Sequence, residues 1–358
     1  MIILKSLNKK QLENFIISGE FQSYDFLPIT DYRAKSQIKN PVAKDEDILL
    51  TLAFEDDQLA GYLGTFPDQL MIENTTIKYA WLSTLYVSEN FRGKRIAQQL
   101  LDHVFDKYEG KIAITEFTKE AESLYAKTKM FNYVEPKNGK RFYFRTNLAT
   151  IIPNRKPKFT KAKPALELVD SIFDLAISFQ AKMQKTNNIQ YEICSKIDDE
   201  SEYFLESFKK NRNTQDLKWI MENPWVLESK EKEKNYQFSS TSNQFSYFWV
   251  KIFDENRQLK TVSLLQLRDQ SLKIPYLFSE NNLQDFRKFL QIFIREKKVK
   301  TLLSYHEKLN TELSKKKFKK LYQKDAERRY LFHKNLIKLL PENFQPAYQD
   351  GDGDPVFT

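Results

Sequence analysis

The sequence has little of what metal sites, triads and secreted folds are built from. Its 358 residues include one cysteine, Cys194, so no internal disulfide can form. The 3 histidines, His103, His306 and His333, are too far apart for metal-ligand spacing, and no Ser/His/Asp arrangement is apparent. The pattern therefore predicts neither a metal centre nor a nucleophilic triad.

Long apolar runs are also absent. No stretch approaches the roughly 18 consecutive apolar residues that a membrane-spanning helix needs. Residues 1–10, MIILKSLNKK, become charged too early for a secretory leader. Together with the lack of disulfides, these features lead us to expect a cytoplasmic protein without a membrane span.

What is present suits a folded protein with an anionic ligand. The composition is 41% hydrophobic and 14% aromatic, enough for packed cores, and the length allows two domains. Lysine and arginine number 57 against 48 acidic residues, a net charge of +9. Because this excess is spread along the chain, we do not expect a nucleic-acid partner.

One stretch organises the chain: residues 81–97, WLSTLYVSENFRGKRIA, read as a strand, a tight loop around Gly93, and a helix start. A helix start carries unpaired N–H groups and partial positive charge, so such a loop can bind phosphate. Three side chains add full positive charges: Arg92, Lys94 and Arg95. An extended ligand could also pair with the strand's unused backbone groups.

This stretch resembles the signature of the GNAT acyltransferase superfamily, an Arg/Gln-x-x-Gly-x-Gly/Ala loop after the fourth strand. Arg92 stands at its first position and Ala97 at its sixth, while Arg95 replaces the usual glycine at the fourth. In that family the loop amides hold the pyrophosphate of acetyl-CoA. The resemblance therefore implies an acetyl-CoA site at Leu85, Tyr86, Val87, Arg92, Gly93, Lys94, Arg95, Ile96 and Ala97. On this stretch alone, an ordinary basic strand-to-helix turn is the alternative.

A second stretch, residues 111–131, is similar to the family's Asn-x-x-Ala-x-x-x-Tyr helix. Thr118 stands at the Asn position, Ala121 at the Ala and Tyr125 at the Tyr. The resemblance implies that Thr118 and Ala121 help to bind the CoA and that Tyr125 is the general acid. Two partial motifs in the right order predict this fold for residues 1–148.

The second half is predicted to be a separate domain. Residues 149–165 are rich in proline and lysine, which indicates an extended connector. Residues 166–358 repeat the element order and also resemble a GNAT domain. However, Glu280 and Asp285 lie where the phosphate loop would be and would repel CoA. We therefore expect an α+β chain of two GNAT-like domains, each a mixed, mostly antiparallel twisted sheet flanked by helices, with the second one degenerate.

Two further segments carry weaker signals. Residues 212–224, RNTQDLKWIMENP, resemble a segment of tandem GNAT-like proteins of polysaccharide and cell-surface biosynthesis, although a tryptophan at helical spacing also suits a core. Residues 350–354, DGDGD, alternate acids as a calcium loop does but lack its later glutamate. We expect a mobile acidic tail there.

The predicted chemistry is acyl transfer from acetyl-CoA, or another short acyl-CoA, to a primary amine by direct attack. An N–H of the strand 85–87 would stabilise the oxyanion, and Tyr125 would protonate the leaving thiolate. Glu116 is the predicted base, with Glu20 or a water chain as alternatives.

Several points stay open at this stage. The acceptor could be a small-molecule amine such as an amino sugar, a polyamine or an amino acid, or a protein lysine. Two other functions compete with the enzyme: an acyl-CoA-binding sensor or scaffold without turnover, and an interaction protein with two decayed GNAT domains. The second domain could bind substrate or form a homodimer.

Overall fold

The computed structural model describes residues 1–72, 75–146, 148–182, 189–233, 235–280, 283–344 and 349–357. The chain forms two compact units that alternate along the sequence. Unit 1 comprises Met1–Lys137, Glu206–Asn243 and Arg328–Thr358, and unit 2 comprises Asn138–Leu205 and Gln244–Glu327. The predicted division, one domain up to residue 148 and a second from residue 166, therefore differs from the one observed, because the end of the chain returns to unit 1.

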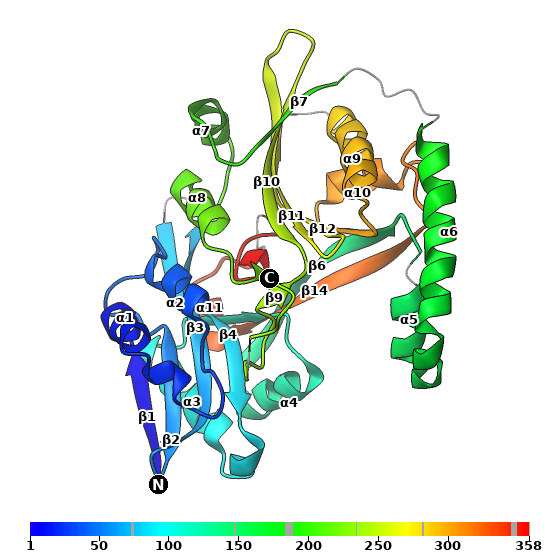
Figure 1. Ribbon diagram of the computed structural model, residues 1–358. Helices are drawn as coiled ribbons and strands as arrows, with labels where there is room; N and C mark the ends of the chain where they lie inside the picture. The colour runs from blue at the N-terminus through cyan, green and yellow to red at the C-terminus, as the bar shows by residue number, and fades with distance from the viewer. Residues whose placement is uncertain are drawn as a thin grey trace. The chain divides into compact units, whose positions relative to one another are not determined.

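Unit 1 is built on a mixed, mostly antiparallel sheet (Figure 1). Its strands, in order across the sheet, are β1 (Ile2–Leu7), β2 (Leu50–Glu55), β3 (Gln58–Ile72), β4 (Thr75–Val87), β5 (Ile112–Thr115) and β14 (Tyr322–His333). All neighbours are antiparallel except β4 and β5, which are parallel. The chain passes between the units within β14 and within β6 (Phe131–Tyr143).

Helices cover both faces of this sheet. They are α1 (Lys9–Ile17), α2 (Asp31–Ile38), α3 (Ile96–Lys107), α4 (Lys119–Thr128), α8 (Thr214–Glu222) and α11 (Lys334–Ile337), with short turns η1 (Glu20–Gln22), η2 (Glu89–Phe91) and η4 (Pro355–Phe357) and the small pair β8 (Leu227–Glu228) and β9 (Thr241–Ser242). Leu52 and Tyr62 belong to one buried cluster, and the next residues along, Ala53 and Leu63, belong to another. Because strand side chains alternate, the sheet is buried on both faces.

Unit 2 has the same kind of sheet. Its pairing order is β6, β13 (Thr301–Ser304), β12 (Ser271–Ser279), β11 (Leu259–Arg268), β10 (Phe245–Phe253) and β7 (Gln190–Cys194). Here again one pair, β12 and β13, is parallel and is joined through a helix, α9 (Gln284–Glu296). The predicted α+β class, with mostly antiparallel strand pairing flanked by helices, is confirmed, but the strands of both units are joined in one 12-stranded sheet and do not form two separate sheets.

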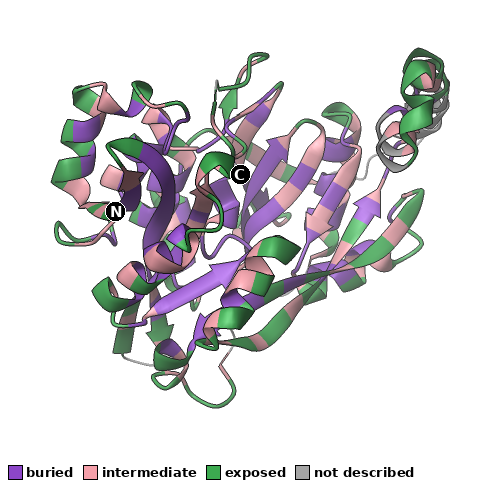
Figure 2. Cartoon of the chain, turned by 90° about the horizontal axis from the view of Figure 1, so that it is seen from below, coloured by how far each residue is buried: buried purple, intermediate pink, exposed green. Residues whose placement is uncertain are grey.

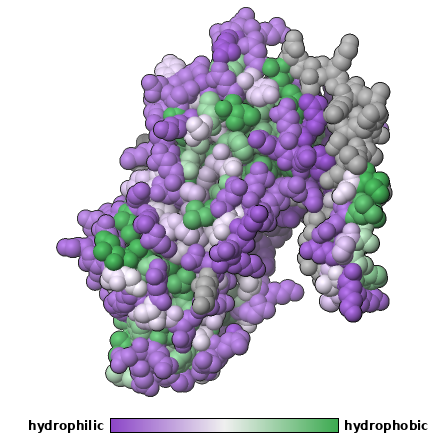
Figure 3. Space-filling model, viewed as in Figure 1, coloured by the Kyte–Doolittle hydropathy of each residue, from purple (hydrophilic) through white to green (hydrophobic). Residues whose placement is uncertain are grey.

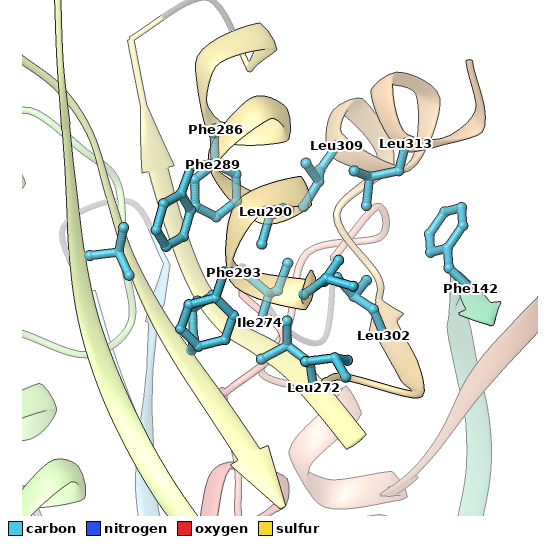
Figure 4. Packing of buried hydrophobic residues seen from close by; sticks show 14 of the residues in the cluster. Phe142, Leu272, Ile274, Phe286, Phe289, Leu290, Phe293, Leu302, Leu309 and Leu313 are labelled. Carbon is cyan, nitrogen blue, oxygen red and sulfur yellow. The ribbon is translucent and has the colours of Figure 1, made fainter. Parts of the chain in front are cut away.

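The core of unit 2 lies between its sheet and two helices (Figure 4). Phe286, Phe289 and Phe293 extend from α9 toward strand residues, and Leu309 and Leu313 come from α10 (Glu307–Ser314). Figure 2 shows the resulting pattern, in which strands are largely buried while helices keep exposed residues on one side. Further helical segments of the chain are α5 (Leu148–Arg155), η3 (Pro157–Ala162), α6 (Lys163–Lys182) and α7 (Asp199–Glu206).

The predicted extended connector is wrong, because residues 149–155 and 157–165 are helical. Pro157 and Pro164 lie in the first turns of η3 and α6, where a missing N–H costs little. Asp170 of α6 accepts the backbone N–H groups of Leu148 and Ala149, each at 3.0 Å, and so stabilises the start of α5.

Apolar side chains are exposed along η3 and α6, where Figure 3 shows a hydrophobic patch. They are Phe159, Leu168, Val169 and Ile172. Among the residues that the structure describes, no helix combines the length and the apolar character needed to cross a membrane.

The predicted mobile acidic tail is also wrong, because residues 350–357 are packed into unit 1. The ring of Phe357 is fully buried and stacks on Trp225, with a centroid distance of 4.4 Å. Phe66 and Trp219 approach the same ring at 5.6 and 5.1 Å. A buried aromatic cluster therefore holds residues 350–357 against unit 1.

Replacing Phe357 with alanine should lower the free energy of unfolding of unit 1 by roughly 3–5 kcal/mol, because it empties the centre of this cluster. Tryptophan fluorescence during urea unfolding measures the change, since Trp219 and Trp225 contact the ring. The control is Leu339→Ala, at a side chain that is 47% exposed, which should cost less than about 1 kcal/mol. Equal effects of the two variants would contradict the packing described here.

Candidate active site

The predicted phosphate loop lies on the surface of unit 1 between β4 and α3. Residues 92–95 are exposed, and Gly93 has a φ of +87° with no atom within 4 Å of where a Cβ would stand. The buried side chains of α3, which include Ile96 and Leu100, fix the helix against the sheet. The first-turn N–H groups of α3 are therefore presented at an open, basic surface.

Two basic side chains of this loop pair with carboxylates, of which Glu89 is exposed and Glu55 is half-buried. Arg92 pairs with Glu89 at 3.1 Å, and Lys94 pairs with Glu55 while lying over the ring of Phe91. Exposed ion pairs contribute about 0–1 kcal/mol, so Arg92 can exchange its carboxylate partner for a phosphate at small cost.

Arg95 replaces the signature glycine, and its backbone explains the family's preference. Its φ is +58°, in the left-handed region, at the position just before α3. Glycine adopts this conformation without strain, whereas other L-residues lose roughly 1–2 kcal/mol. Arg95 adopts the left-handed backbone conformation that glycine favours. The replacement of glycine therefore adds a side chain without changing the backbone conformation that we infer for this position.

The strand before the loop is irregular where a substrate would meet it. The register of β4 with β3 shifts at Ser83, because Thr84 pairs with Gly64 and Leu82 pairs with Thr65. In the described part of the chain, β5 pairs with β4 only at Ala80 and Trp81. Beyond Trp81, including the predicted residues Leu85, Tyr86 and Val87, alternate N–H groups of β4 therefore point to a side that β5 does not pair.

The second motif places its residues as expected around α4. Thr118 is the N-cap and accepts the N–H of Ala121 at 3.3 Å. Tyr125 is buried between Phe117 and Phe131. Burial raises the pKa of Tyr125, and the nearby carboxylate of Asp354 raises it further, so the phenol keeps its proton at neutral pH.

The predicted base, Glu116, is engaged by a cation. It follows β5 with a φ of +53°, and its carboxylate lies 3.2 Å from the buried guanidinium of Arg328. The alternative Glu20 accepts from Tyr24 at 2.6 Å and pairs with Lys5 at 3.3 Å. The hydrogen bond from Tyr24 lowers the pKa of Glu20.

Three residues that the sequence analysis missed form a hydrogen-bonded chain beside Tyr125. Nη2 of Arg33, on α2, donates to Oγ of Ser83 at 2.7 Å, and Oγ of Ser83 donates to Oδ2 of Asp354 at 2.6 Å. Arg33 is held by stacking 4.1 Å over Trp225 and by the hydroxyl of Tyr236 at 3.1 Å. No local motif marks these residues, because only tertiary packing brings them together.

The environment of Asp354 raises its proton affinity. Burial raises its pKa to about 6, while the hydrogen bond from Ser83 lowers it. The negative charge of Glu116 raises the pKa and the positive charge of Arg33 lowers it, both more weakly. Asp354 as a residue is of intermediate exposure, while burial of its carboxyl is the main cause of the raised pKa.

The segment 212–224 belongs to this unit and not to a separate second domain. Arg212 is buried and pairs with Asp68 at 2.9 Å. Trp219 is also buried, and its Nε1 donates to the backbone oxygen of Ser36 at 2.9 Å. These are the contacts of a core tryptophan, which was the simpler interpretation of the segment.

Unit 1 thus combines a mixed sheet with a bulged fourth strand, a basic loop at a helix start and a following helix that carries Tyr125. Residues 12–129 match the family model described as Acetyltransferase (GNAT) family. This part of the chain is therefore a GNAT domain, and the resemblance seen in the two motifs is confirmed. No curated protein sequence matches the chain.

Solved structures resemble more of the chain. A probable N-acyltransferase from Enterococcus faecalis matches with a TM-score of 0.55 at 9% identity, covering 94% of this chain and 73% of that one. A GCN5-related N-acetyltransferase from Anabaena variabilis matches with a TM-score of 0.50 at 9% identity, covering 92% and 72%. At such low identity the likeness concerns the fold.

Substitution of Arg95 tests the backbone explanation. Arg95→Gly should be more stable than Arg95→Ala by roughly 1–2 kcal/mol, because alanine keeps the left-handed strain and glycine does not. Thermal unfolding of the two variants, which lose the same charge, provides the comparison. A more stable alanine variant would show that the loop does not require this conformation.

Proposed function

We propose that unit 1 is an acyl-CoA-dependent N-acyltransferase that transfers an acetyl or other short acyl group to a primary amine. The observation that carries the proposal is that one unit combines an exposed basic loop at the start of α3, a β4 whose end β5 does not pair, and a buried Tyr125. The family match of residues 12–129 supports the same activity class.

The loop supplies the phosphate site in this proposal. First-turn N–H groups at Ile96 and Ala97, with the cations of Arg92, Lys94 and Arg95, would bind the pyrophosphate of CoA. The acyl-bearing arm would extend along β4 and take its unused N–H groups by strand-like pairing. One of these N–H groups, in the segment 85–87, would face the thioester oxygen.

The chemistry follows from this placement. The neutral amine attacks the thioester carbon, and the negative charge on the oxygen is stabilised by the β4 N–H. The carbon–sulfur bond then breaks, and the CoA thiolate takes the phenolic proton of Tyr125. Because burial keeps this phenol protonated, it is available as an acid throughout the neutral range.

Unit 2 is proposed not to bind CoA. Its parallel pair, β12 and β13, is flanked at the start of α9 by Asp285, and Glu280 follows β12. Two carboxylates there would oppose a phosphate. The acceptor is proposed to be a primary amine, either a small molecule or a protein lysine.

The double variant Arg92→Ala/Lys94→Ala should bind acetyl-CoA at least about 10-fold more weakly than the intact protein, because two charge-assisted phosphate contacts are lost. Calorimetric titration measures the affinity. The control is Lys10→Ala/Lys39→Ala, which removes the same charge from exposed positions outside the loop and should leave binding unchanged. No binding by the intact protein would contradict the enzyme and favour an interaction protein.

Replacing Tyr125 with phenylalanine should lower kcat by roughly 10²–10⁴-fold while acetyl-CoA affinity stays unchanged, because only the proton donor is lost. Thiol release from acetyl-CoA with a panel of amines measures turnover. Tyr133→Phe is the matched control, since that phenol is exposed and bonded to Glu122. Binding without thiol release from the intact protein would favour a sensor over an enzyme.

A further inference from the structure

The chain Arg33–Ser83–Asp354 fixes the direction of its hydrogens. The guanidinium of Arg33 can only donate, so Oγ of Ser83 accepts from it and must direct its own proton to Oδ2 of Asp354. The carboxylate is therefore oriented by a neutral hydroxyl. In the described part of the chain, it has no direct ion pair. Glu116, by contrast, is bound directly by Arg328.

The position of Asp354 relates it to the reacting groups of the proposed enzyme. Ser83, its partner, is the bulge residue of β4, two residues before the segment 85–87 that is proposed to hold the thioester. The charge of Asp354 reaches Tyr125, whose pKa it raises. The carboxylate thus binds a residue of β4 and acts electrostatically on the proposed acid.

An amine acceptor requires a base close to the reacting nitrogen. Primary amines are mostly protonated at neutral pH, and an ammonium cannot attack a carbonyl. A base with a proton affinity near neutrality can take that proton and also attract the cation beforehand. The raised pKa of Asp354 meets this requirement. The carboxylate of Glu116, by contrast, is already paired with the guanidinium of Arg328.

We propose that Asp354 is the general base that deprotonates the acceptor ammonium, with Ser83 and Arg33 as the residues that position it. This inference rests on the proposed acyltransferase function. In this proposal Asp354 takes the place of Glu116 as the base. Glu116 then affects only the pKa of Asp354, through its negative charge.

The step balances as follows. The acceptor R–NH3+ gives one proton to the carboxylate of Asp354 and leaves R–NH2, whose lone pair forms the carbon–nitrogen bond. The carbon–sulfur bond breaks, and Tyr125 protonates the thiolate. The second proton lost by nitrogen restores the tyrosine, and Asp354 releases its proton to solvent. The products are the amide, free CoA and one proton.

The hydrogen-bonding and titratable groups that surround Asp354 give the test its direction. They are Ser83 of β4, Arg33 of α2, Glu116 after β5 and Tyr125 of α4. A base that must be ionised makes kcat/KM rise through its pKa, near pH 6, and level off above it. Removing the negative charge at position 116 should move this limb to lower pH, and removing the hydroxyl at position 83 should move it to higher pH.

The experiment measures thiol release from acetyl-CoA against pH with glucosamine, spermidine, lysine and a lysine peptide as acceptors. Asp354→Asn should retain acetyl-CoA binding by calorimetry, lose roughly 10²–10⁴-fold in turnover and lose the limb near pH 6. Glu116→Gln should keep turnover with the limb shifted down, and Ser83→Ala should shift it up. Asp57→Asn, at an exposed turn, is the matched control and should leave the profile unchanged.

The outcomes distinguish a wrong assignment of the base from a wrong proposed function. If Asp354→Asn keeps the acidic limb and Glu116→Gln loses it, Glu116 is the base and the assignment of Asp354 is overturned. If Glu116→Gln leaves the limb where it is, the coupling to Asp354 is overturned as well. If the intact protein releases no thiol with any of the amines, the proposed function fails, and the base assignment fails with it.

Discussion

The buried ion pair between Arg212 and Asp68 is the contact on which the site depends. Charges removed from water are stable only when they are paired and hydrogen-bonded. Asp68 accepts from Arg212 and from Trp81 Nε1, each at 2.9 Å, and burial raises its pKa while the charge of Arg212 lowers it. Arg212 also donates to the backbone oxygen of Gly353 at 3.1 Å. One guanidinium therefore joins β3 to the segment that carries Asp354, and so positions that carboxyl.

The middle of β4 and the part that begins at Ser83 have different roles. Its middle is a core strand, with Trp81 fully buried and bonded to Asp68. The bulge at Ser83 then turns a side chain toward Arg33 and Asp354 and coincides with the loss of pairing to β5. The site thus arises where regular pairing ends, because backbone groups that no strand uses are those that a substrate can bind.

Much of the fold and part of the site could be predicted from the sequence. The loop around Gly93 and the helix bearing Tyr125 are local, so residue order and helical spacing were sufficient to find them. The structure adds that Thr118 is the N-cap of this helix. Local signals failed where distant contacts decided the structure. Residues 350–354 look like a solvated acidic run until the stacking of Phe357 on Trp225 is known.

The return of the chain to unit 1 has a kinetic consequence. Strand β14 lies beside β5, where Thr115 Oγ1 donates to the backbone oxygen of Arg329, a residue 214 positions later. Such a contact closes a very long loop. Closing it costs conformational entropy, so contacts of this kind form slowly during folding. The sheet of unit 1 is therefore complete only after β14 has paired with β5. Until that strand arrives, the edge of β5 is unpaired and open to association with other strands.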